Sequence, residues 1–220
     1  NDDKALEYFS EAARLAPTEL RYLVNQAELL AKSSREDEAM EIFQQVLNHD
    51  PRYETAYIGI GNIYQENEEI ELAASQFARA VRFNPQSVAA RNNYASTLVK
   101  LENYEEALVE TQEILKLQPE HNVSHRRIAK ILVHFARNEE AAQALERAIE
   151  YHPDDAFLLH EAGKIYDRCQ QPSQAIKYLE KAHRLNPEDS NLVLNLGKVL
   201  HDSGRIDDAI GPDPGDGRGG

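Results

Sequence analysis

One short stretch of the chain combines histidines and cations and lacks any carboxylate. Residues 121–135 read HNVSHRRIAKILVHF, in a protein that has 38 Asp and Glu against 24 Lys and Arg and a net charge of −14. The two arginines and the lysine of this stretch could bind carboxylates through charge-assisted hydrogen bonds. His121 and His125 are four residues apart, which places both rings on one face of a helix, but no Cys, Asp or Glu beside them completes a metal ligand set. The stretch therefore indicates anion recognition, and we expect no metal site.

No arrangement of residues typical of an enzyme is present elsewhere. The sequence lacks the phosphate-binding loop, the dinucleotide-binding glycine motif, the zinc-protease helix motif and the nucleophile-elbow motif. Acidic pairs such as Glu105 and Glu106 fall in predicted first turns of helices, where they favour the positive end of the helix dipole. The single Cys169 has no partner for a disulfide or a redox pair. We predict a protein that is not an enzyme and needs no cofactor.

Charge and hydropathy exclude two classes of partner. A strongly acidic chain is unsuited to general binding of nucleic acid or anionic membranes, since both require clustered Lys and Arg. No run approaches the ~20 apolar residues of a membrane span, so we expect no membrane insertion. Nothing resembles a signal peptide, and a cytoplasmic location is expected. Because the only methionine is Met40, we also expect the true N-terminus to lie outside this sequence.

A 34-residue period organises the chain. Twelve residues before each of six prolines stands an alanine, and the alanine series extends to Ala209. Larger side chains follow four and seven residues after these alanines, so the three positions share one face of a helix. A second set of small and large residues upstream predicts another helix in each period, packed on the first through the small residues. The six prolines, each 34 residues from the next, are Pro17, Pro51, Pro85, Pro119, Pro153 and Pro187.

These positions carry a resemblance to a known family. The segments YIGIGNIYQENEEIELAASQFARAVRFNP and LHEAGKIYDRCQQPSQAIKYLEKAHRLNP resemble tetratricopeptide repeats. The resemblance implies an all-α, right-handed superhelical solenoid of antiparallel helix pairs that binds proteins or peptides. At Arg91 and His125 the bulky fourth position of the family pattern is polar, so we expect weaker packing in those repeats.

The period also predicts the domain organisation. We expect a single solenoid over residues 1–210, followed by a disordered or non-native tail at 211–220, whose sequence GPDPGDGRGG disfavours a helix. The solenoid would consist of a half repeat at 1–19, full repeats at 20–53, 54–87, 88–121, 122–155 and 156–189, and a partial repeat at 190–210.

The resemblance implies that the first helix of each repeat lines a concave groove. Its lining is rich in Asn early in the chain and basic late, and the helices expected at 87–101 and 121–135 contain no carboxylate. We therefore predict a protein or peptide partner with acidic or carboxylate groups, held by Asn amides on its backbone and by Arg and Lys on its charges. The candidate ligand-binding residues are Asn62, Asn92, Asn93, Lys100, Arg126, Arg127, Lys130, His160, Lys164, Arg168, Asn195 and Lys198.

Two alternative functions remain open. The chain could be the targeting domain of a larger enzyme similar to the O-linked N-acetylglucosamine transferases, in which the resemblance implies an asparagine ladder at the sixth position of successive repeats. Asn25, Asn93 and Asn195 match that ladder, while Gly59, Arg127 and Glu161 break it. The chain could instead be a structural scaffold that self-associates through its incomplete terminal repeats.

Some tetratricopeptide domains hold the C-terminal carboxylate of a peptide with a five-residue clamp. In the frame that begins at residue 54, Asn62, Asn93 and Arg127 match the clamp. Ile58 and Val123 stand where the clamp has its two lysines. We therefore expect an anion site that is weaker than this clamp or shaped differently from it.

Overall fold

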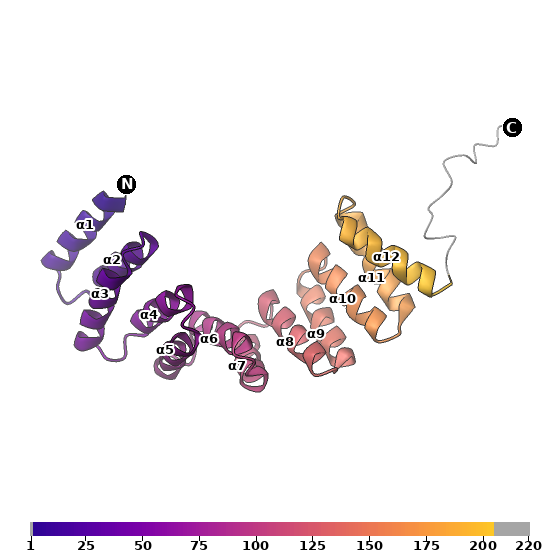
Figure 1. Cartoon of the computed structure of the whole chain (residues 1–220), viewed down its shortest axis with the longest axis horizontal. Helices are drawn as coiled ribbons and strands as arrows, with labels where there is room; N and C mark the ends of the chain where they lie inside the picture. The colour runs from indigo at the N-terminus through magenta and orange to yellow at the C-terminus, as the bar shows by residue number, and fades with distance from the viewer. Residues whose placement is uncertain (1, 205–220) are drawn as a thin grey trace, which may run out of the picture. The chain divides into compact units, whose positions relative to one another are not determined.

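The chain is helical throughout its described part. The computed structural model describes residues 2–204, and within them it contains twelve α-helices and no strand (Figure 1). The helices are α1 (Asp2–Leu15), α2 (Leu20–Lys32), α3 (Glu36–His49), α4 (Glu54–Glu66), α5 (Ile70–Phe83), α6 (Val88–Lys100), α7 (Tyr104–Leu117), α8 (Asn122–His134), α9 (Asn138–Tyr151), α10 (Ala156–Arg168), α11 (Pro172–Leu185) and α12 (Ser190–Asp202). Two helices fall in each predicted 34-residue repeat, which confirms the all-α prediction. Ala209 and the predicted tail at 211–220 lie outside the described residues.

The helices pack in sequential pairs. We call α2, α4, α6, α8, α10 and α12 the first helices, and α1, α3, α5, α7, α9 and α11 the second helices. Each first helix from α2 to α10 packs on the second helix that follows it. The chain divides into two compact units, Asn1–Leu117 and Gln118–Gly220, which we call the N-terminal and C-terminal units and describe separately. The single solenoid expected over residues 1–210 stays a prediction.

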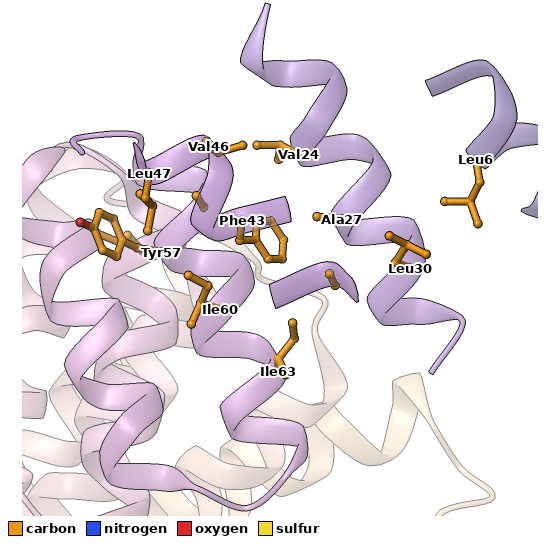
Figure 2. Close-up of a cluster of buried hydrophobic side chains, with 14 residues drawn as sticks. Leu6, Val24, Ala27, Leu30, Phe43, Val46, Leu47, Tyr57, Ile60 and Ile63 are labelled. Atoms are coloured by element: carbon orange, nitrogen blue, oxygen red, sulfur yellow. The ribbon is translucent and has the colours of Figure 1, made fainter. Parts of the chain in front are cut away.

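Small residues allow the paired helices to approach closely. The alanines of the 34-residue series on α3, α5, α7, α9 and α11 are fully buried. On the first helices, a Cβ added to Gly61 would lie 2.6 Å from the Phe77 ring, and one added to Gly163 would lie 2.6 Å from Leu179. In the N-terminal unit the Phe43 ring is enclosed by buried side chains of α2 and α4 (Figure 2). The predicted packing of small against large residues is confirmed at these positions.

The turn after each first helix has one repeated geometry. Its second residue takes a left-handed conformation, with φ of 59° at Ser34 and 57° at Ala136, although left-handed positions favour glycine. After α2, α4, α6, α8 and α10 the next amide donates to the carbonyl five residues back, as from Arg35 to Leu30 at 2.9 Å, which closes the helix end in a Schellman motif. The left-handed residues, again 34 apart, are Ser34, Glu68, Glu102, Ala136, Gln170 and Gly204.

The polar residues at the fourth position of two repeats make the same hydrogen bond as a tyrosine at that position. The Tyr57 hydroxyl donates to the Pro51 carbonyl oxygen at 3.0 Å. Arg91 Nε donates to the corresponding oxygen of Pro85 at 2.8 Å, and His125 Nε2 lies 2.8 Å from that of Pro119. His125 is buried and Arg91 is largely so, and each side chain bonds to the carbonyl that the phenol would satisfy, while the expected weaker packing on the preceding repeat stays a prediction.

Candidate partner-binding surface

The cations of α8 differ sharply in exposure. Arg126 is exposed, and its guanidinium carbon lies 4.1 Å from the centroid of the Phe157 ring on α10. This stacking holds the arginine in place while leaving its edge open to a ligand. Arg127 is partly buried, and burial lowers the pKa of its guanidinium below the usual value. Lys130 is exposed one turn further along the helix. Arg126 and Lys130 are therefore better placed than Arg127 to meet an anion.

Lysine stands at the same repeat position on all three first helices of the C-terminal unit. The series is Lys130 on α8, Lys164 on α10 and Lys198 on α12, each 34 residues from the next. Lys164 Nζ lies 2.6 Å from Glu161 Oε1, and Lys198 Nζ lies 3.6 Å from Asp167 Oδ2. Two lysines of the predicted basic lining are thus ion-paired within the protein, which the repeat spacing did not predict.

His160 and Asn195 join two first helices of the C-terminal unit. Asn195 Nδ2 lies 2.7 Å from His160 Nε2. Burial, assisted by the Lys164 ammonium, lowers the pKa of His160, so the neutral ring accepts this hydrogen bond from the amide. These two predicted site residues therefore contact each other. Arg168, at the end of α10, is exposed.

Apolar side chains are exposed on the same first helices. Phe157 on α10 is 49% exposed and Leu194 on α12 is 70% exposed, and Val123 on α8 is exposed as well. Large exposed apolar residues near charged ones are typical of surfaces that bind proteins. None of these three was among the candidate site residues, although their positions in the repeat already placed them on the lining side.

Amide side chains lie between two first helices of the N-terminal unit, α4 and α6. Asn93 Nδ2 donates to Asn62 Oδ1 at 3.3 Å, from α6 to α4. The Thr97 hydroxyl lies 3.3 Å from Gln65 Oε1 between the same two helices. Lys100, at the end of α6, is exposed. This surface offers a ligand amide hydrogen bonds together with the Lys100 ammonium.

Two other lining positions of the N-terminal unit, Asn92 and Gly59, are partly or wholly buried. Asn92 is only partly exposed on α6. Gly59 is buried, and a Cβ added to it would lie 2.1 Å from the Phe43 ring, so this position serves the core and not the lining.

The two histidines of α8 and its N-terminal cap bond to neighbouring groups of the protein. His121 Nδ1 lies 2.8 Å from the Ser124 hydroxyl, and His125 bonds to the Pro119 carbonyl. Residues 2–204 hold no group of three metal-ligating side chains. Burial raises the pKa of the Cys169 thiol, which disfavours the reactive thiolate. Among the same residues, no helix combines the length and apolar character that crossing a membrane requires.

Comparison with solved structures defines the class of protein. YrrB, described as a TPR protein with an unusual peptide-binding site, matches with a TM-score of 0.71 and 25% identity over 90% of this chain and 99% of its own. MamA from Desulfovibrio magneticus RS-1 matches with a TM-score of 0.65 and 22% identity over 71% of this chain and 89% of its own. TTC0263 from Thermus thermophilus, a thermophilic TPR protein, matches with a TM-score of 0.54 and 16% identity over 83% of this chain and 99% of its own. The helix pairs and their 34-residue period thus belong to a tetratricopeptide repeat protein.

The family can be stated more narrowly. The model of the cilia and flagella-associated protein 70 C-terminal domain matches residues 1–211, and the chain belongs to that family. No curated protein sequence matches the chain. Tetratricopeptide proteins are generally scaffolds for protein interaction, so the first-helix surfaces are its candidate binding surfaces.

Proposed function

We propose that the chain is a non-enzymatic interaction module that binds an acidic segment of a partner protein on the first helices of its C-terminal unit. The observation that supports this most is on α8. Arg126 and Lys130 are exposed there, and neither forms an ion pair with any residue in the part of the chain that the structure describes. Cations left without carboxylates in a protein of net charge −14 suit an anionic ligand.

The exposed apolar side chains favour a protein partner over a small anion. Phe157 and Leu194 add apolar area to the cationic surface, and burying such area contributes about 25 cal/mol per Å². A partner segment with alternating acidic and apolar residues would use both features. The amide pair of Asn62 and Asn93 in the N-terminal unit would contribute separately, through hydrogen bonds to a peptide backbone. The peptide-binding site named for YrrB is consistent with a peptide ligand.

Peptide titration tests this proposal directly. Fluorescein-labelled peptides of mixed acidic and apolar residues are titrated with the whole chain and followed by anisotropy at several salt concentrations. Arg126→Ala should weaken binding roughly three- to tenfold, since a charge-assisted contact loses part of its strength to screening at an exposed site. Higher salt should weaken binding of the unaltered chain.

The matched control is Arg147→Ala. Arg147 is an exposed arginine on α9, a second helix, and forms no ion pair with the residues described. Lys181 is less suitable because its ammonium donates to the Pro153 carbonyl at 2.7 Å. Equal loss from both arginine variants, or binding that salt does not change, would place the ligand elsewhere.

The alternatives have less support. For a glycosyltransferase targeting domain the asparagine ladder would have to continue, yet Gly59 packs on Phe43 and Glu161 pairs with Lys164. Self-association through the terminal repeats would appear as concentration-dependent sedimentation. We also propose a cytoplasmic location, which imaging of the tagged full-length protein would test.

A further inference from the structure

The three lysines of the C-terminal unit occupy equivalent places but differ in their neighbours. Lys130 on α8 is exposed and has no carboxylate partner among residues 2–204. Lys164 is paired with Glu161 on its own helix, and Lys198 with Asp167 on the neighbouring first helix. We call these three equivalent lysines the lysine row. Two of them are already ion-paired with carboxylates of the protein.

The two carboxylates are themselves accessible to a ligand that approaches the row. The side chains of Glu161 and Asp167 are each about one-third exposed, at 32% and 33%, and Lys198 is 63% exposed. Exposed ion pairs of this kind are weak, typically about 0.2–1 kcal/mol, so a partner carboxylate can replace them. A partner that brings only one carboxylate gains little at these lysines, because it displaces one acid with another and meets their repulsion.

We infer that Glu161 and Asp167 are specificity-determining residues that restrict the lysine row to partner segments with several acidic residues. This inference rests on the proposed function. The Glu161 and Asp167 carboxylates each lower the affinity for any acidic segment. Only a segment that contacts all three lysines at once gains enough binding free energy to offset this lowered affinity. The pair thereby distinguishes a multiply acidic segment from a singly charged peptide or a lone C-terminal carboxylate.

The spacing of the row indicates a suitable probe. Helices in contact lie about 8–10 Å apart. A polyproline-II chain rises about 3.1 Å per residue with three residues per turn, so acids at every third position share one face at about 9 Å. The probe is therefore a labelled peptide with Glu at three positions spaced by three residues. A second peptide with a single Glu, otherwise of the same sequence, reports the singly charged case.

The test compares Glu161→Gln with unaltered protein as the whole chain. Glu161→Gln should tighten binding of the three-Glu peptide roughly two- to fivefold, the range that one exposed ion pair supports, and should tighten the one-Glu peptide by a larger factor. Adding Asp167→Asn should increase the affinity for both peptides further and reduce the preference for the three-Glu peptide over the one-Glu peptide. Lys130→Gln should weaken binding in both the unaltered and the substituted chain.

The matched control is Glu140→Gln, because Glu140 on α9, a second helix, pairs at 2.6 Å with Arg137, which lies three residues earlier and directly before that helix. Tightening by Glu161→Gln but not by Glu140→Gln supports the inference. If the unaltered chain binds the three-Glu peptide and Glu161→Gln leaves the affinity unchanged, this inference is wrong and the proposed function stands. Failure of the unaltered chain and the variants to bind either peptide would overturn the proposed function itself. A single-stranded oligonucleotide bound as tightly, and tightened by the same substitution, would show a general polyanion site and overturn the inference.

Discussion

Adding one methyl group at the same repeat position should change the stability of the chain differently at two glycines. Gly61 on α4 and Gly197 on α12 are four repeats apart. A Cβ at Gly61 would lie 2.6, 2.8 and 3.0 Å from three atoms of the Phe77 ring, and Phe77 has no exposed surface. A Cβ at Gly197 would have no heavy atom within 4 Å among the described residues. The two sites therefore share a helical backbone and differ in the space around them.

The expected free energies follow from two terms. Replacing Gly by Ala in a helix interior favours folding by about 1 kcal/mol at both sites. Overpacking opposes it at Gly61 alone, by about 1–3 kcal/mol, because the buried ring has no free volume to enter. Gly61→Ala should thus range from neutral to destabilising by about 2 kcal/mol, while Gly197→Ala should stabilise by up to about 1 kcal/mol. Their difference, about 1–3 kcal/mol, is the measured quantity.

Urea titration followed by circular dichroism measures that difference, with thermal melting as a check. For a chain of this size, 1 kcal/mol corresponds to about 2–4 °C in Tm. Gly163→Ala, whose added Cβ would lie 2.6 Å from Leu179 and 3.2 Å from the Ala175 carbonyl oxygen, should behave like Gly61→Ala. If Gly61→Ala is as stable as Gly197→Ala, the close packing of first on second helices assigned here is incorrect.

Three further predictions concern stability and titration. Ala136→Gly should stabilise the chain by roughly 0.5–1 kcal/mol, because Ala136 is left-handed at φ 57° and Gly removes the Cβ strain; a loss of stability in urea would contradict this. Arg91→Leu should lower the free energy of unfolding by about 3 kcal/mol, because it leaves the Glu110 carboxylate unpaired at 15% exposure. Adding Glu110→Leu should restore most of this stability, and equal stability of the single and double variants would refute the role of the ion pair. Burial and a hydrogen bond to Glu146 raise the pKa of Tyr178 to about 12, so the stability of the folded state should fall as pH rises from about 10 to 12. Absorbance titration at 295 nm should show Tyr178 ionising late in the unaltered chain and earlier in Glu146→Gln. Ionisation that Glu146→Gln leaves unchanged would contradict the contact.

The sequence alone determined the helices and the contacts inside each pair. A packing face repeats within one helix at spacings of three and four residues, so alanines such as Ala39 and Ala73 and the phenylalanines four residues after them could be assigned to the core without coordinates. Proline and the period then set the ends of the helices. These are local properties of the chain, and each repeat confirms the others.

Only the tertiary structure decided which polar side chains remain available to a partner. Arg126 and Arg127 are adjacent in sequence, yet one stacks in the open on Phe157, 31 residues away, and the other is partly buried. Lys198 looks like a free cation until Asp167 of the preceding first helix is placed beside it. Exposure and ion pairing depend on neighbours about one repeat away and on rotamers chosen against them, whereas the period specifies only the face on which a residue lies.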